Sequence, residues 1–440
     1  MMKKLKNYIV AAFAAAAVWG AVSLYFTIAG RDVQGDFYSD WMPKEACHAP
    51  EENAYFHIKR FKDDFDQSDH TASGIDYNLR HAFLEGTTNR LALADKINAY
   101  LSAESNTLAV AQKILSSRGL SIPIDETDVF KYFSAVQYVA SVYAVKATSE
   151  AVGGDIAKAR SSLMDMYRIG RVLLDAESPY SFSLTFGHII CINALDEAAK
   201  PLFAPDEDEA WLKKVRGLCL TLSADGDQRM KAAVKRDLVS EAVSISKESP
   251  RDILLARDTN PLAAVLLVFP GYARYALQSN RYIESYRASA EEMIRKLGEK
   301  KYDLAYARRE LQARKNPFER NWLGEALADD RGWSCRSVYR ALFRHHFDMR
   351  ALATALACRS YKARHGAYPK ALSDLVPEFL DEVPRDPFDG EELRYNAKDL
   401  FVWTPGERLS FTGKVKLGKN GKPYWSSHRN SRCIHYIERR

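Results

Sequence analysis

The sequence has few of the features that mark an unusual class of protein. Its 440 residues include only 22 glycines and 16 prolines, too few for a fibrous or low-complexity chain. No HExxH, GxSxG or CxxC motif occurs, so the common signatures of zinc peptidases, α/β-hydrolases and paired-thiol sites are absent. Hydrophobic residues make up 47% of the chain and charged residues 27%, which excludes disorder as the main state. The length suggests two or three folded domains.

Two near-matches to ligand-binding motifs fail on inspection. The segment that starts at Asp64 has the spacing of a calcium loop, but Asp69 replaces the glycine and Ile75 replaces the final glutamate. The run GKVKLGK at 413–419 resembles a phosphate loop, but Asn420 replaces the Ser or Thr and a turn sequence follows. We therefore assign no catalytic residue, no cofactor-binding residue and no metal ligand.

The excess of positive charge is confined to the two ends of the chain. Lys3, Lys4 and Lys6 precede an uncharged stretch. Residues 408–440 hold nine basic residues and one acid, a net charge of +8 against +6 for the whole chain. Such a tail is either a solvated surface or a contact surface for an anionic partner. If it binds a partner, the candidate residues are Lys414, Lys416, Lys419, Lys422, Arg429 and Arg432.

Residues 8–30, which end at Gly30, carry no charge. As a helix this segment spans about 34 Å, enough to cross a hydrocarbon core of about 30 Å. Tyr8 and Tyr25 lie near its ends, where aromatic residues are favoured. We expect the lipid bilayer to be its partner; a cleaved signal peptide is the alternative, although its apolar region would be shorter. The lysines before it predict a cytoplasmic N-terminus, with the rest of the chain outside the cytoplasm.

Helical periodicity dominates the middle of the chain. A helix is predicted to begin after Asp155, a suitable N-cap, and to place one apolar stripe on its face (Ala159, Leu163, Met166, Ile169, Leu173). Further helices are predicted at 179–201, 207–222, 227–246, 261–297 with a kink at Pro270-Gly271, 302–314 and 344–365. The apolar run at 261–269 is too short to span a bilayer and predicts a buried helical segment. Helix pairs of this length are typical of a helical-hairpin array.

The last hundred residues have a different pattern. Repeated X-Pro pairs after Gly366 exclude a long helix. Short strands are predicted at 393–396 and 400–404, and Asn420-Gly421 predicts a further hairpin. The predicted fold class is mainly α, with a transmembrane helix, a helical-hairpin domain and a small C-terminal α+β module. The predicted divisions are 1–30 (cytoplasmic stub and anchor), 31–52 (linker), 53–335 (helical domain) and 336–440 (module with basic tail).

Six cysteines are present, and an extracytoplasmic location would permit disulfides. Fifteen connectivities are possible, and the sequence does not select one. Cys191 lies in an apolar stretch, where a buried thiol and a bridge are equally compatible with the pattern. A bridge from Cys335 or Cys358 to Cys433 would tie the basic tail to the module.

The stretch from about 345 to 405 carries a recognisable string of motifs. It reads HGAYP at 365–369, LSDLVP at 372–377, LDEVPRDPFDG at 380–390 and LRY at 393–395. This string resembles the globular part of the type II secretion major pseudopilin. The resemblance implies a helix covered by an extended segment, followed by β-hairpins. Pseudopilins start with a processed N-terminus that includes a glutamate, which is missing here, so we do not expect a filament subunit.

The rest of the chain resembles a group of uncharacterised, membrane-anchored helical proteins of planctomycete and verrucomicrobial-type bacteria. The features behind this are PEENA at 50–54, the helix pair at 154–201 and the same C-terminal module. This resemblance implies no particular activity.

Together these features predict a single-pass protein of the bacterial inner membrane with most of its chain in the periplasm. We expect a non-enzymatic scaffold or interaction protein of the cell envelope, whose partner is an envelope protein or an anionic surface. No nucleic acid and no small-molecule substrate is indicated. The alternatives are an accessory component of a type II secretion or pilus-like system, and an envelope enzyme with an unrecognised site.

Overall fold

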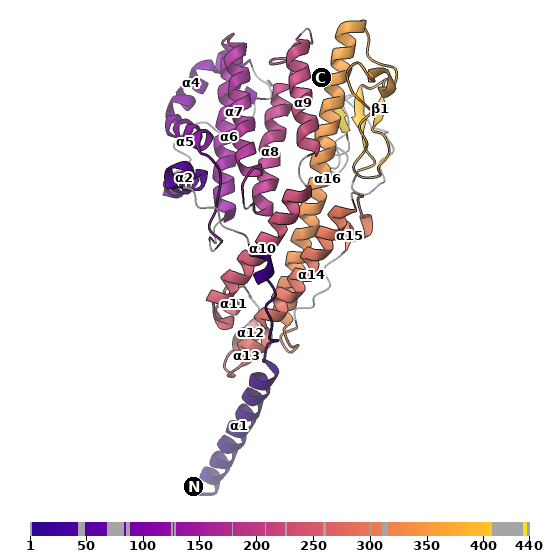
Figure 1. Cartoon of the computed structure of the whole chain (residues 1–440). Helices are drawn as coiled ribbons and strands as arrows, with labels where there is room; N and C mark the ends of the chain where they lie inside the picture. Colours follow the sequence, from indigo (N-terminus) through magenta and orange to yellow (C-terminus); the bar gives the residue numbers. More distant parts are fainter. Residues whose placement is uncertain are drawn as a thin grey trace.

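The computed structural model is mostly helical, as the sequence predicts (Figure 1). It describes residues 2–42, 49–67, 83–84, 89–124, 126, 129–177, 179–206, 208–224, 227–257, 261–299, 301–309, 316–406 and 434–437. Helix α1 (Met2–Ala29) projects alone from one end of the body. Its stretch Ala11–Ala29 is long and apolar enough to cross a membrane.

The body is built from helices that follow one another in sequence and pack side by side. They are α2 (Ala54–Gln67), α4 (Ala94–Ala103), α5 (Ser105–Ser116), α6 (Val129–Val152), α7 (Ile156–Leu174), α8 (Ser181–Ala198), α9 (Glu209–Ala224), α10 (Asp227–Lys247), α11 (Pro250–Arg257), α12 (Pro261–Leu266), α13 (Tyr272–Ala276), α14 (Ser279–Gly298), α15 (Leu304–Arg308) and α16 (Trp322–His365). Short 3-10 turns lie at Ser39–Trp41, Pro50–Glu52, Leu91–Leu93 and Leu372–Leu375. Helices α6, α7 and α8 form one packed group, and α16 packs against α8, α9 and α14.

Helix α7 begins where its N-cap residue predicts. The Asp155 carboxylate accepts a hydrogen bond from the backbone N–H of Lys158 at 3.0 Å, which satisfies one of the free donors of the first turn. The predicted stripe of five apolar residues is buried. It faces α6 and α8, so this part of the periodicity argument is confirmed.

The segment at 261–297 is not one kinked helix, as the sequence suggested, but the three helices α12, α13 and α14. Gly271 adopts a φ of +86°, which other residues rarely adopt, and Pro270 has no backbone N–H to continue a helix. The expectation that the apolar run is buried is also only half right. Ala263 and Leu266 are buried, but Val265 and Val268 are 64% and 61% exposed.

Helix α16 is the longest element of the body. It has 44 residues, a length of about 66 Å, whereas the sequence predicted only its second half. It ends at Gly366, which has a φ of +79° and donates its N–H to the carbonyl of Lys362, as expected of a C-cap. The predicted division between residues 335 and 336 falls inside this unbroken helix.

The C-terminal part packs along the second half of α16. Strand β1 (Arg394–Asn396) pairs antiparallel with β2 (Phe401–Trp403), and β2 pairs antiparallel with β3 (Ile434–Tyr436). Val402, Ile437 and Phe388 are buried in the same continuous core as the helices. This module therefore shares the core of the helical body and does not form a separate one. The turn predicted at Asn420-Gly421 lies outside the described residues.

Candidate functional site

The end of α1 is fixed to the body by an aromatic cluster. Phe26 is buried, with its ring centroid 5.1 Å from that of Tyr272 and 4.9 Å from that of Tyr275. Both tyrosines belong to α13, which directly follows the turn at Pro270-Gly271. Aromatic pairs at such distances contribute about 0.5–1.5 kcal/mol beyond the burial of their area.

The turn at Gly271 touches the backbone of α1. A Cβ atom at this position would lie 2.7 Å from the backbone nitrogen of Thr27. The Thr27 hydroxyl donates to the carbonyl of Ser23, one turn earlier in α1, at 2.8 Å. The positive φ of Gly271 and the close approach both require glycine here. The last two turns of α1 are therefore in direct contact with the body.

Gln278 and Asn321 join the end of α1 to the starts of two long helices. The Gln278 side-chain amide donates to the carbonyls of Ala29 and Arg31, at 3.0 and 3.2 Å. Its backbone N–H donates to the Asn321 side-chain oxygen at 2.8 Å. Gln278 precedes α14 and Asn321 precedes α16, and both side chains are buried. We call this pair the junction.

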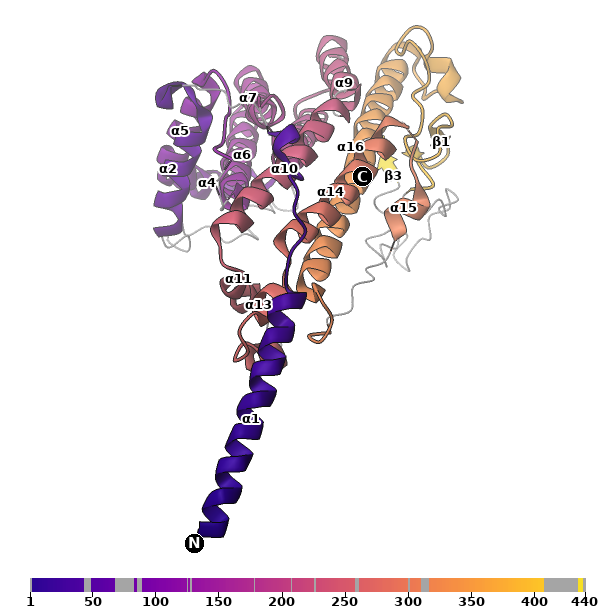
Figure 2. The same cartoon turned by 60° about the horizontal axis from the view of Figure 1, so that its bottom comes forward.

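The chain after α1 continues along α14. The Asp32 carboxylate accepts from the backbone N–H groups of Asn280 and Arg281, at 2.6 and 3.2 Å. A residue about 250 positions away in the sequence thus caps the N-terminus of α14, where a negative charge is favourable. Further along, Arg287 makes a bidentate ion pair with Asp40 at 2.7 and 2.9 Å. The hydrogen bond from Arg287 lowers the pKa of Asp40. Figure 2 shows this segment lying beside α14.

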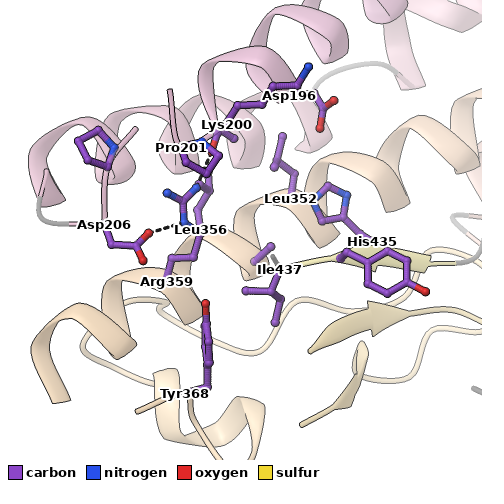
Figure 3. Close-up of a pocket in the computed structure, with 14 residues that line it drawn as sticks. Asp196, Lys200, Pro201, Asp206, Leu352, Leu356, Arg359, Tyr368, His435 and Ile437 are labelled. Carbon is purple, nitrogen blue, oxygen red and sulfur yellow. Dashed lines mark hydrogen bonds and ion pairs between the residues drawn. The ribbon is translucent and has the colours of Figure 1, made fainter. Parts of the chain in front are cut away.

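The other notable feature is a cavity of about 400 Å³ at the far end of the molecule. It lies between the loop after α8, the second half of α16 and β3 (Figure 3). Leu352 and Leu356 form an apolar wall, and His435 and Ile437 face them from the strand side. The cavity marks the place where the C-terminal strand meets the helical body.

The charged group beside this cavity is bound within the protein. Arg359 is 6% exposed and donates to the carbonyls of Ala199 and Ala204. Its Nε donates to Asp206 at 2.7 Å. Each guanidinium nitrogen therefore already has an acceptor, and Arg359 ties the loop between α8 and α9 to α16 (Figure 3).

The buried histidines show no arrangement suited to a metal ion. His345 of α16 stacks on His188 of α8 with ring centroids 5.3 Å apart. Burial lowers the pKa of His346 to about 3 and holds that of His345 well below its ordinary value, so both are neutral at physiological pH. Among the residues that the structure describes, no group of three or more His, Cys, Asp or Glu is placed to hold a metal.

The residues singled out in the basic tail cannot be placed. Lys414, Lys416, Lys419, Lys422, Arg429 and Arg432 lie outside the described residues, as does Cys433. Cys335 and Cys358 are buried, free thiols of α16, and Cys191 is also a free thiol. The disulfide to Cys433 stays a prediction. Cys335 and Cys358, its two candidate partners, are both free thiols in the structure.

The junction was not predicted from the sequence. Gln278, Asn321 and Asp32 are ordinary polar residues whose partners lie far away along the chain. One local signal was available, since Tyr272 and Tyr275 follow an apolar run that ends in Pro270-Gly271. Aromatic residues beside an apolar run are typical of a membrane interface.

Comparisons of the chain with protein-family models, with curated proteins and with solved structures found no match.

Proposed function

We propose that the protein is a membrane-anchored scaffold or interaction protein of the bacterial cell envelope. Helix α1 crosses the inner membrane with its N-terminus in the cytoplasm, and the body lies in the periplasm. The C-terminal module and its basic tail form the contact surface for an envelope protein or an anionic polymer. Lys3, Lys4 and Lys6 support this orientation through the positive-inside rule.

The observation that carries the proposal is the junction. Gln278 and Asn321 connect the end of α1 to α14 and α16 at a single point. Helix α16 then runs for about 66 Å, and the C-terminal module packs along its second half. Figure 1 shows α1 and the module at opposite ends of the molecule. A continuous connection of this kind would hold the module at a fixed height above the bilayer, which suits a protein that presents a surface to a partner.

An accessory role in a secretion or pilus-like system is the second candidate. It is favoured by the segment after α16, which resembles a pseudopilin. In that segment Gly366 and Gly390 both take positive φ values, of +79° and +82°, at the turns where the motif has glycine. Tyr361 and Phe379 make an edge-on contact that holds the extended segment over the helix. The pseudopilin-like fold, the helical hairpins and the β-hairpins remain part of this proposal.

The orientation can be tested by protease treatment of cells with a permeabilised outer membrane. We expect the body to be digested and a tag before Lys3 to be protected. The protein should also remain in the membrane fraction after a high-salt wash. A soluble form that starts near Gly30 would instead show that residues 8–30 are a cleaved signal.

The contact surface can be tested with the full-length protein. We expect a partner to co-purify at low salt and to be lost as salt rises, because screening weakens contacts between exposed charges. Changing Lys414, Lys416, Lys419 and Lys422 to Glu should abolish the co-purification. The matched control changes four exposed lysines of the helical body to Glu: Lys96, Lys113, Lys158 and Lys213. An equal loss in both variants, or no loss in either, would refute the role of the tail.

A further inference from the structure

Five of the ten exposed large apolar side chains described outside α1 lie near the end of the body from which α1 leaves. They come from α11, from α12 and the turn after it, and from the segment before α16. Their members, which we call the basal apolar surface, are Leu255, Leu262, Val265, Val268 and Phe318. Among the described residues, all but five of the exposed large hydrophobic side chains belong either to α1 or to this surface. Single exposed apolar residues are ordinary, but such a concentration marks an interaction surface.

Contacts place this surface beside the last turns of α1. Phe269, the neighbour of Val268, lies with its ring centroid 6.0 Å from that of Phe26. Tyr272 and Tyr275, which hold Phe26, donate their hydroxyls to the carbonyls of Pro317 and Phe318 at 3.0 and 2.6 Å. Helix α11 packs against α13. Figures 1 and 2 both show α11 and α13 at the base of α1.

The length of α1 determines where the membrane surface lies along this helix. The apolar stretch Ala11–Ala29 has 19 residues, a length of about 28 Å. A hydrocarbon core of about 30 Å can cover it only if the membrane surface lies at the level of Ala29. The body touches α1 from Tyr25 to Gly30, through the rings of Tyr25 and Phe26 and the backbone at Thr27. The parts of the body that contact these turns are therefore at the depth of the lipid headgroups or below.

The side chains of α1 itself agree with this depth. Leu24 and Ile28 remain more than half exposed although Phe26 and Gly30 are covered by the body. The side of α1 that turns away from α13 is thus apolar up to its last turn. Arg31, Arg274 and Arg320, just beyond this level, are exposed. Arginines at this position can reach lipid phosphates while apolar side chains beside them enter the membrane.

We infer that the basal apolar surface is a second membrane contact, immersed in the outer leaflet of the same bilayer that α1 spans. The inference rests on the proposed function, since it requires α1 to be an anchor. It goes beyond that function because it makes α11 and α12 lipid-binding elements. The protein then contacts the membrane at two places, through the spanning helix α1 and through the basal apolar surface, which we also call the foot. Its body therefore cannot tilt freely about α1.

The test uses the full-length protein in phosphatidylethanolamine–phosphatidylglycerol vesicles, with a photoreactive benzoylphenylalanine at one position at a time. We expect lipid adducts at Val265 and Val268, as at Phe13 of α1. Leu91, an exposed apolar residue on the body far from α1 in the sequence, is the matched control and should give no lipid adduct. A second set of variants places the reactive residue at Phe318. There, Val265→Glu with Val268→Glu should abolish the lipid adduct, whereas Leu91→Glu should leave it unchanged.

The outcomes separate this inference from the proposed function. Lipid adducts at Phe13 without any at Val265 and Val268 would overturn the foot and leave the anchor standing. Adducts of Val265 or Val268 to a protein, whether a second copy or a partner, would overturn the foot as well, because its occupant would not be lipid. Absence of lipid adducts at Phe13 would refute the anchor and with it the foot.

Discussion

At the scale of single residues, Asp237 is a carboxylate whose surroundings disfavour its ionised form. It accepts hydrogen bonds from the backbone N–H and the hydroxyl of Ser181, at the start of α8. Burial nevertheless raises the pKa of Asp237 to about 6, against the opposing effect of these bonds and of Arg331. The pKa is then above the ordinary value of an aspartate, about 3.9.

A raised pKa has a defined effect on stability. Between about pH 4 and pH 6 the folded protein binds a proton at Asp237 that the unfolded chain has released, so the free energy of unfolding falls as the pH rises. Asp237→Asn keeps this side chain neutral at every pH. We expect the variant to be more stable than the wild type above pH 6, by at most about 3 kcal/mol, with the difference fading towards pH 4.

The measurement is denaturant unfolding of the full-length protein in detergent between pH 4 and pH 8. Asp95→Asn, at an exposed position on α4, serves as the control and should leave the pH dependence unchanged. If the curve of Asp237→Asn runs parallel to that of the wild type, Asp237 is already ionised at low pH and burial does not raise its pKa.

At the scale of elements, α7 and α8 approach each other closely where two glycines face one another. A Cβ atom on Gly170 would lie 2.6 Å from the sulfur of Cys191 and 2.9 Å from the carbonyl oxygen of Gly187. The backbone of α8 cannot give way locally, so Gly170→Ala must push the two helices apart. We expect it to destabilise the protein by about 1–3 kcal/mol, the usual cost of overpacking.

A second glycine provides a control of opposite sign. Gly217 lies on the exposed side of α9, and a Cβ atom there meets nothing within 4 Å. Because alanine is the better helix former, Gly217→Ala should stabilise the protein by about 0.5–1 kcal/mol. Thermal unfolding of both variants gives the comparison. A Gly170→Ala protein as stable as Gly217→Ala would show that α7 and α8 are not in close contact.

The sequence predicted those elements whose signals are local. Asp155 caps the helix that follows it, and Gly366 ends the helix before it, so a short window of residues contains all the information. The first half of α16 was missed because its buried stripe includes small and charged residues, among them Gly332, Cys335 and Arg336. Such residues give the stripe little hydrophobic contrast with the exposed side of the helix, so the periodicity is weak.

The candidate site depends on contacts that no local pattern contains. Asp32 caps α14 across about 250 residues, and Gln278 reaches the end of α1 over a similar separation. Helix α1 was recognisable because length and apolar composition are sufficient to predict a helix that is able to cross a membrane. The basal apolar surface was misjudged because residues 261–269 form a short helix and a turn with one buried side and one exposed side.

At the scale of the whole molecule, the question is whether the anchor and the body move as one unit. The core continues from Phe26 through the helices to Ile437 near the C-terminus. Between α1 and this core, the segment after Ala29 is held by hydrogen bonds to Gln278, Asn280 and Arg320. If these hydrogen bonds persist, a force on the C-terminal module is transmitted to α1 without bending between α1 and the body.

Cleavage by trypsin after Arg31 reports directly on this connection, because a protease needs the segment to detach from α14 before it can bind. Gln278→Ala removes the two hydrogen bonds to the carbonyls of Ala29 and Arg31 and leaves the cleavage sequence intact. Each such bond contributes about 1 kcal/mol. The detached form should therefore become about 5- to 30-fold more populated, and cleavage should accelerate by the same factor when opening is fast.

Gln137→Ala, at an exposed position on α6, is the matched control and should be cleaved like the wild type. The rate is read as the appearance of the fragment that begins at Asp32, with the full-length protein in vesicles. Equal rates in the two variants would mean that the junction does not hold the segment, and that the body is free to swing on α1.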